Sequence, residues 1–292
     1  MSSSRMEAFF QGYNPYTGGK LPEQARHAHR HHSQPQGPQQ GYPQDGMAPQ
    51  VNPNEVLDPL YQAQNELSKA RAGINQVRQA WGNVQREVNS AYTQTTRTSN
   101  DLYPAENDTE ETDNSRTGYY ASNSLDQIER QLSSLRYDRS NPSSVLYEIK
   151  GQLANAQAYL NQVDAGRLPN PYRHSECKSY LGQFQSQLYR IEMAQQQLED
   201  KLQALQNPIS SARYDLNAVS RDSEGVSVAY QARSARGNLN NLAQQLQQID
   251  QHLRYADGDL TQAESAANSA EQNAQSAYQD YQYNWHTSDR RF

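Results

Sequence analysis

The chain has 292 residues, of which only 34% are hydrophobic, and its mean hydropathy is -1.08. A globular core usually needs close to half apolar residues, so this composition excludes a broad core and leaves disorder or helices that bury a narrow stripe. The formal net charge of -6 argues against general binding to nucleic acid or anionic lipid, because both require an excess of Lys and Arg.

The first stretch, residues 1–52, is rich in Gln, Pro, Gly, Tyr and His. Such a composition buries too little apolar surface to offset the entropy of ordering, so a disordered tail is predicted. Its tyrosines, spaced by Gly and Gln, are typical of self-associating tails, although a solvated leader is the alternative. Four imidazoles in this tail are candidate ligands for a metal ion, but the run lacks the cysteines and the folded frame of a structural zinc site. They are His27, His29, His31 and His32.

From residue 53 to residue 285, apolar residues recur every three and four positions, which predicts long helices that each present one narrow seam to the others. The first helix is expected at about 54–102, with Asn52-Pro53-Asn54 at its start and Pro104 beyond its end. Its Thr-rich last turns are expected to fray. Trp81 falls on the seam, so we expect a core position for it. The seam comprises Val56, Leu60, Ala63, Leu67, Ala70, Ile74, Val77, Trp81, Val84, Val88, Ala91, Thr95, Thr98 and Leu102.

The second helix is expected at about 123–164. Asn141-Pro142 interrupts it, yet the heptad phase is the same on both sides, so the two halves are predicted to share one axis with a kink or short turn between them. Its seam comprises Leu125, Ile128, Leu132, Leu135, Leu146, Ile149, Leu153, Ala156, Leu160 and Val163.

The third helix is expected at about 175–219, with His174 in the preceding loop and a further kink at Asn207-Pro208. Cys177 falls on the seam near the start and is interpreted as a small buried residue. Gln195 is the single polar seam position, and a buried polar side chain of this kind often sets helix register. The remaining seam residues are Leu181, Phe184, Leu188, Ile191, Leu198, Leu202, Leu205, Ile209, Ala212, Leu216 and Val219.

The fourth helix is expected at about 226–284, unbroken at Asp257-Gly258-Asp259 because the seam keeps its phase there. From Ala263 onward the seam is almost entirely alanine, which buries little area per layer, so a second copy of the chain could cover this end. Four aromatic residues close the helix and are candidates either to cap the bundle or to bind a partner. They are Tyr278, Tyr281, Tyr283 and Trp285.

The predicted fold is therefore all-α: an elongated antiparallel four-helix bundle of long, partly Pro-kinked helices with a disordered N-terminal tail and a short C-terminal tail at 286–292. Helices of this length reach on the order of 60 to 85 Å.

No catalytic motif occurs in the sequence, so neither an enzymatic activity nor a cofactor is expected. The favoured function is a non-enzymatic structural or scaffold protein that acts through protein–protein interaction and self-association as a homo-oligomer. The alternatives are a curvature-sensing membrane-surface module of the BAR type and a component of a secretion or phage-type assembly. A small-molecule substrate is not expected. Without a recognisable signal peptide or transmembrane segment, the cytoplasm is the default location.

Overall fold

The computed structural model describes residues 52–107, 114–137, 142–221 and 226–288. The chain divides into a unit Met1–Gln50 and a unit Val51–Phe292, and every described residue lies in the second. The predicted disordered tail and its four histidines therefore lie outside the described residues. What is described confirms an all-α bundle.

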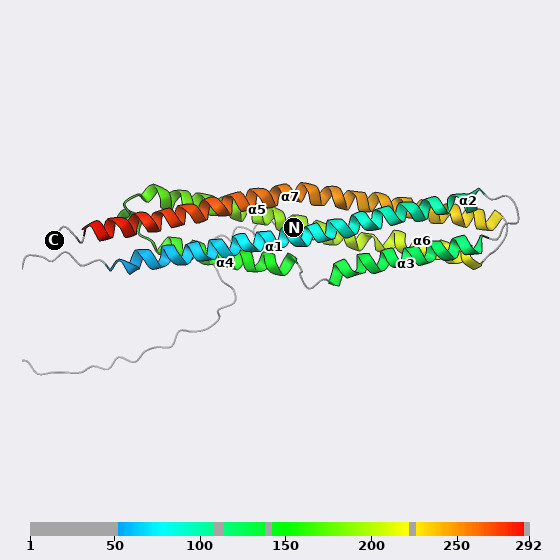
Figure 1. Ribbon diagram of the computed structural model, residues 1–292, viewed down its shortest axis with the longest axis horizontal. Coiled ribbons are helices and arrows are strands. Elements are labelled where there is room, and N and C mark those ends of the chain that lie inside the picture. Colours follow the sequence, from blue (N-terminus) through cyan, green and yellow to red (C-terminus); the bar gives the residue numbers. More distant parts are fainter. Residues whose placement is uncertain (1–51, 108–113, 138–141, 222–225, 289–292) are drawn as a thin grey trace, which may run out of the picture. The chain divides into compact units, whose positions relative to one another are not determined.

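The bundle is built from long helices that run side by side, as Figure 1 shows. In chain order they are α1 (Asn54–Asp101), α2 (Tyr103–Glu106), α3 (Ser115–Tyr137), α4 (Pro142–Gln162), the 3-10 turn η3 (Ala165–Arg167), α5 (Pro171–Ala204), α6 (Gln206–Arg221) and α7 (Val226–Ser288). The longest, α7, has 63 residues and spans about 95 Å at 1.5 Å per residue.

The helices form four antiparallel columns around one core. The first column is α1, the second is α3 followed by α4, the third is α5 followed by α6, and the fourth is α7. The first column packs against α3, α4 and α7, and the third packs against α3, α4 and α7 in turn. Neighbours along the chain are thus neighbours in space, and the up-down-up-down order expected for four helices with short connections is observed.

The second and third columns are both interrupted, at the same level of the bundle. Ser143, at the start of α4, donates a hydrogen bond of 2.8 Å to Glu199, near the end of α5. The start of α4 therefore lies near the level at which α5 gives way to α6 at Leu205. Proline explains both interruptions, because Pro142 and Pro208 lack the N–H that a continuous helix requires. Only α1 and α7 pass this level without a break among the described residues.

The predicted seams form the core. All seam residues are buried except Val84 and Leu135, which are half-buried and pack against the same cluster. The helix α7 continues through Asp257-Gly258-Asp259, as predicted. The expected fraying of the first helix is not observed, because Thr95 and Thr98 are buried and α1 remains helical to Asp101.

The second and third helices begin earlier than expected. The predicted start near residue 123 is wrong because the seam continues back through two small residues, Gly118 and Ala121, which are both buried. A Cβ at Gly118 would lie 2.8 Å from the backbone nitrogen of Ser220, so glycine is what lets α3 approach α6. The predicted start at 175 is wrong because Pro171 occupies the first turn of α5, where proline is favoured.

The alanine seam of α7 is covered by the chain itself. Ala263, Ala267, Ala270 and Ala274 have no exposed surface, and the thiol of Cys177 on α5 donates a hydrogen bond of 3.2 Å to the carbonyl oxygen of Ala270. Small side chains bring α5 and α7 close enough to exclude water. A second copy is therefore not needed to cover this seam.

Candidate functional site

The candidate metal ligands of the sequence analysis, His27, His29, His31 and His32, lie outside the described residues. Within the described part of the chain, no group of three or more His, Cys, Asp or Glu side chains is arranged to hold a metal ion. The candidate site must therefore be sought among the other features of the bundle.

A polar layer crosses the core at Gln195, the single polar residue in the predicted seam of the third helix. The indole Nε1 of Trp81 donates to Gln195 Oε1 at 2.7 Å, and Gln195 Nε2 donates to Glu199 Oε1 at 2.8 Å. Ser143 also donates to this carboxylate, so the layer links α1, α5 and α4. Both buried polar groups are satisfied, as burial requires. The register-setting role of Gln195 stays a prediction.

Two reactive residue types lie buried at the start of α5. Burial raises the pKa of the Cys177 thiol to about 12, so the thiol is protonated at neutral pH and is a poor nucleophile. His174, which the sequence analysis placed in a loop, occupies the first turn of α5 at a seam position and is 4% exposed. Its Nε2 lies 2.8 Å from the carbonyl oxygen of Leu160, and burial lowers the pKa of the ring. A neutral imidazole therefore donates to a carbonyl in the last turn of α4.

Three of the four predicted partner-binding aromatic residues lie against the bundle. Tyr281 is 7% exposed and stacks on Trp285, with ring centroids 6.5 Å apart. Tyr278 is partly buried and packs on Tyr61 of α1 at 6.2 Å. Tyr283 is 70% exposed. Tyr278, Tyr281 and Trp285 thus cap this end of the bundle, while partner binding by the group stays a prediction.

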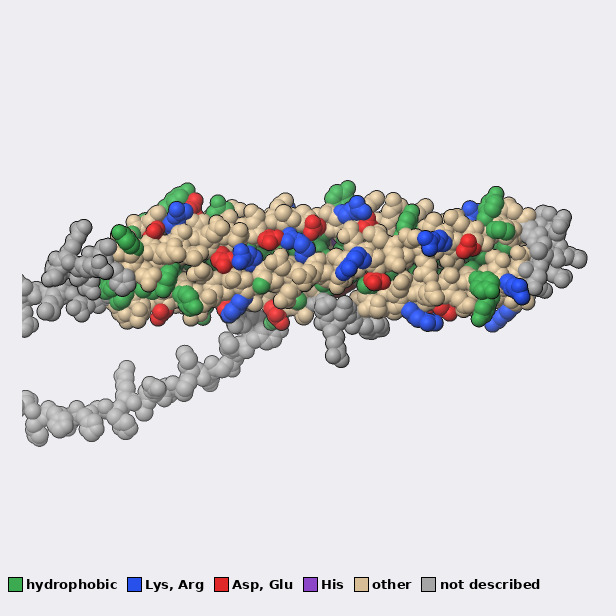
Figure 2. All heavy atoms as spheres, viewed as in Figure 1, with side chains coloured by type: hydrophobic (Ala, Val, Ile, Leu, Met, Phe, Trp, Pro, Cys, Tyr) green, Lys and Arg blue, Asp and Glu red, His purple; other side chains and the backbone are tan. Residues whose placement is uncertain are grey.

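Ion pairs join neighbouring helices along the outside of the seams. Arg78 on α1 pairs with Asp257 and Glu264 on α7, and Arg213 on α6 pairs with Asp126 and Glu129 on α3. Figure 2 shows the result on one face, where basic and acidic side chains are intermixed and no single-sign patch forms.

Two carboxylates in these networks have lowered pKa values. The pKa of Glu106 on α2 is lowered by a hydrogen bond from Arg236 and by a second from Arg233. Burial would raise the pKa of Asp250, but hydrogen bonds from Gln85 and Asn89 together with the charge of Arg254 outweigh it. Both side chains therefore act as anionic links between helices.

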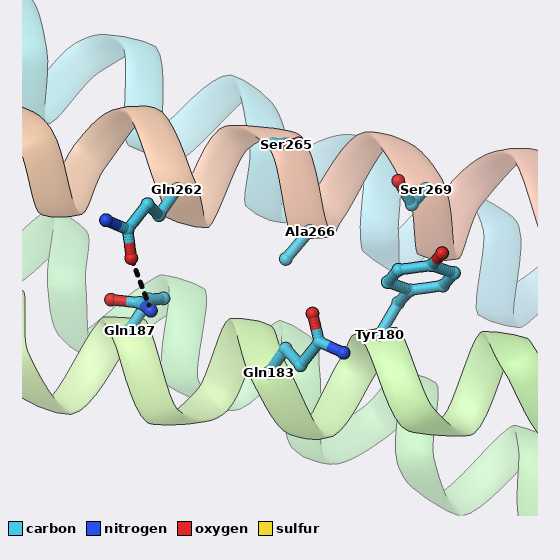
Figure 3. Close-up of a pocket in the computed structure, with 7 residues that line it drawn as sticks. All are labelled: Tyr180, Gln183, Gln187, Gln262, Ser265, Ala266 and Ser269. Carbon is cyan, nitrogen blue, oxygen red and sulfur yellow. Dashed lines mark hydrogen bonds between the residues drawn. The ribbon is translucent and has the colours of Figure 1, made fainter.

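Two shallow grooves adjoin one another between α5 and α7. The first, shown in Figure 3, has a volume of about 240 Å³ and an amide bridge at one end, where Gln187 Nε2 donates to Gln262 Oε1 at 2.9 Å. Its lining residues are Tyr180, Gln183, Gln187, Gln262, Ser265, Ala266 and Ser269. The second begins two residues further along α5 and has a volume of about 310 Å³. Its lining residues are Tyr189, Arg190, Met193, Ala194, Gln197, His252, Tyr255, Ala256 and Asp259. We call the surface formed by these two grooves the α5–α7 face.

Tyrosine dominates the apolar surface of the described residues. Every exposed large hydrophobic residue among them is a tyrosine except Met193. The tyrosines are Tyr61, Tyr92, Tyr103, Tyr119, Tyr120, Tyr147, Tyr172, Tyr189, Tyr214, Tyr230, Tyr255 and Tyr283. The sequence analysis did not select most of these residues, although a signal was present: an aromatic residue off the seam of a bundle helix must face outward.

Comparison of the chain with protein-family models, with curated proteins and with solved structures found no match. No helix among the described residues combines the length and apolar character needed to cross a lipid bilayer. The candidate site therefore rests on the geometry of this bundle alone.

Proposed function

We propose that the chain is a non-enzymatic scaffold that works through protein–protein contacts, including contacts between its own copies. The observation that carries the proposal is the set of tyrosines exposed along the bundle. A protein that has buried its apolar seams within itself gains no stability from exposing aromatic rings, so their presence at many points of the surface supports a role in contact with other proteins.

The chemistry of tyrosine fits such contacts. Its ring supplies a large apolar area with few rotatable bonds, and its hydroxyl keeps the free surface soluble and can hydrogen-bond to a partner. Tyrosine is accordingly enriched in protein interfaces, where charged residues are depleted. The tyrosine rings are distributed over α1, α2, α3, α4, α5, α6 and α7, which supports contact with several partners or copies along one rigid body.

The grooves of the bundle support the same proposal. The two grooves of the α5–α7 face are shallow. The first is lined mainly by uncharged amide, hydroxyl and aromatic groups, and the second adds one Arg–Asp pair, Arg190 and Asp259, and the imidazole of His252. A small-molecule site normally encloses most of its ligand and places a few polar groups around it. Open, shallow grooves with few charged groups are better suited to contact with a protein surface.

The alternative as a membrane-surface module receives less support. A helical module of that kind needs Lys and Arg gathered on one face, where each cation near an anionic surface contributes about 1 kcal/mol. Here Arg71, Arg78, Arg213 and Arg236 are engaged in ion pairs with acidic residues of neighbouring helices. Co-sedimentation with vesicles of anionic lipid tests this alternative, since salt-sensitive pelleting would favour it over the scaffold.

Self-association is the testable part of the proposal. Sedimentation velocity of the full 33.1 kDa chain over a range of concentrations is expected to show a species heavier than the monomer. A variant with six exposed tyrosines changed to serine should shift toward the monomer, because the interface area is lost. The six are Tyr119, Tyr147, Tyr189, Tyr214, Tyr230 and Tyr255.

A matched control keeps the number of surface substitutions equal. It changes six exposed glutamines to serine, namely Gln62, Gln185, Gln203, Gln247, Gln248 and Gln272, and is expected to behave as the parent chain. A parent chain that stays monomeric at every concentration would contradict self-association, and equal behaviour of the two variants would remove tyrosine as its cause.

A further inference from the structure

We propose that the α5–α7 face is the contact between two copies of this chain, and that the two copies pair in parallel about a two-fold axis running along the bundle. This inference rests on the proposed self-association and goes beyond it by assigning the surface, the orientation and the residues that oppose one another.

The composition of the α5–α7 face distinguishes it from the other grooved side of α7. The groove between α1 and α7 is lined by Arg78, Arg254 and Asp257, and its charges are already paired across the two helices or within α7. The α5–α7 face has fewer charges for its size: its charged side chains are limited to Arg190 and Asp259, which form one ion pair, besides the imidazole of His252. Interfaces have a centre depleted of charge, and the α5–α7 face has such a composition.

The apolar surface of this face is gathered at one level. Tyr255 is 82% exposed, the most exposed of the large hydrophobic residues described, and Tyr189 is 60% exposed. Met193 is 45% exposed, and among the described residues it is the one exposed large hydrophobic side chain that is not a tyrosine. Methionine adapts its shape to an opposing surface. These three side chains line the same groove and form an apolar centre with polar amides beyond it.

The charges of the face select the occupant and its orientation. Arg190 and Asp259 lie at one level, on opposite sides of the groove, and form a long ion pair within the chain, with Nη1 and Oδ1 3.9 Å apart. A two-fold axis along the bundle lays α5 of one copy over α7 of the other. Arg190 then faces Asp259 of the second copy, and the reciprocal pair forms by symmetry. Met193 meets Tyr255 of the second copy in the same arrangement.

The other two-fold arrangement is disfavoured. An axis in the plane of the face but across the bundle lays α5 over α5 in antiparallel copies. Each Arg190 would then face Arg190 of the other copy, and each Asp259 would face Asp259. Like charges brought together at an interface weaken the association. Charge complementarity therefore favours parallel copies of this chain.

A charge-reversal cycle in the full chain tests the pairing. Arg190→Asp alone and Asp259→Arg alone each place like charges opposite one another in the parallel dimer, so we expect each to raise the dissociation constant by about tenfold or more. The double variant Arg190→Asp/Asp259→Arg restores opposite charges and should recover most of the affinity. Circular dichroism checks that each variant keeps its helix content.

A pair of tyrosine substitutions locates the face. Tyr255→Ser is expected to weaken the dimer, whereas Tyr147→Ser should leave its dissociation constant unchanged. Tyr147 lies on α4, outside the α5–α7 face, and its 78% exposure matches that of Tyr255 closely. The two variants thus remove the same chemical group at equal solvent exposure and differ only in position.

A spin label at Gln279→Cys reports the orientation. Cys177 is buried with a thiol pKa of about 12, so the introduced thiol reacts selectively. Parallel copies place the two labels two to three helix diameters apart, about 20 to 30 Å. Antiparallel copies centred on Asp259 would separate them by twice the 20 intervening residues, about 60 Å. A distance near 60 Å would overturn the parallel arrangement.

The outcomes separate this inference from the proposed function. A parent chain that associates while Arg190→Asp and Tyr255→Ser associate equally well overturns the α5–α7 face and leaves the scaffold proposal standing. A parent chain that remains monomeric overturns both. Loss of affinity in the single reversals with recovery in the double variant supports the pairing described here.

Discussion

The two ends of the bundle share one core but are closed by different chemistry. At one end, which we call the charged end, α2 is tied to α7 by Glu106, which pairs with Arg233 and Arg236, and Arg236 also lies over the ring of Tyr103 at 4.9 Å. At the other, the aromatic end, α1 and α7 are closed by Tyr61 on Tyr278 and by Tyr281 on Trp285. Charge closes one end and aromatic rings close the other.

The difference shows two ways to cover the last core layers of a narrow helical bundle from water. A heptad seam protects its interior layers from water on all sides, but its last layers need a cover. Ion pairs at a half-exposed position add little energy and depend on pH and salt, whereas ring burial adds more and is insensitive to both. The two ends should therefore respond differently to mutation and to pH.

The largest effect is expected at the aromatic end. Tyr281→Ala removes a ring that is 7% exposed and leaves Trp285 without its stacking partner, so the free energy of unfolding should fall by about 2 to 4 kcal/mol. Urea denaturation followed by circular dichroism measures this. Tyr283→Ala, two residues away and 70% exposed, is the control. Equal losses in the two variants would show that Tyr281 does not seal the end.

A smaller effect is expected from the close approach of α3 and α6 near the charged end. Gly118→Ala places a methyl group 2.8 Å from the backbone nitrogen of Ser220 and should cost about 1 to 3 kcal/mol. Gly237→Ala on α7 meets nothing within 4 Å and should stabilise by up to about 1 kcal/mol, since alanine is the better helix former. The midpoints of urea unfolding should move in opposite directions; a gain in both would refute the close approach.

Loss of the ion pairs at the charged end should cost less still. Glu106→Gln keeps the shape of the side chain but removes its charge, so unfolding should become easier by about 0.5 to 1 kcal/mol. Added salt should weaken the parent chain toward the variant, because salt screens only the charged form. A difference that stays constant from low to high salt would argue against an electrostatic closure.

The smallest effect expected is on the pH dependence of stability, because His174 and Glu106 change their contributions over different pH ranges. Burial lowers the pKa of His174 from its ordinary value of 6.5. The unfolded chain therefore takes up a proton at this residue before the folded chain does, so the contribution of neutral His174 to the free energy of unfolding is complete above pH 6.5 and declines below it. Hydrogen bonds from Arg236 and Arg233 lower the pKa of Glu106 from 4.5, so its contribution is lost only below about pH 4.5.

Hydrogen exchange read by mass spectrometry resolves the two ranges. Between pH 6.5 and 5, protection corrected for the intrinsic rate should fall first at the α4–α5 connection and remain high at α2. His174→Phe keeps an aromatic ring without a titrating nitrogen and should remove this early loss. Simultaneous loss at both ends would contradict the assignment of one titrating group to each.

Much of the fold was predictable because one periodic pattern carries it. Apart from Gln195, the seam positions from Val56 to Tyr281 are small or apolar at intervals of three and four, and long helices with such seams bury them by packing side by side. The starts of α3 and α5 were missed because Gly118, Ala121 and His174 do not look like seam residues. Glycine and alanine carry a seam where backbones approach closely, and a neutral histidine can do so when its N–H finds a carbonyl.

The candidate site was less predictable than the fold. That Tyr189, Met193 and Tyr255 fall off the seam indicates that they face outward, but which outward residues share a groove depends on the order of the columns. Both α5 and α7 had to be neighbours for Arg190 to meet Asp259, and the seams do not state that order. The aromatic residues at the end of α7 stand out in the sequence. Which of them pack on the bundle and which stay exposed depends on where α1 begins, and the seam pattern alone does not give this.

The break shared by α3–α4 and α5–α6 has a mechanical consequence. Among the described helices, α1 and α7 cross that level without interruption, so they should resist bending there more than α5 and α6, which are separated by a turn at Leu205. The start of α1 and the end of α7 also lie at the same end of the bundle, where Tyr61 meets Tyr278. Tension applied between these two points peels the helices apart layer by layer, as in a zipper, and should release the chain at far lower force than tension that slides them lengthwise.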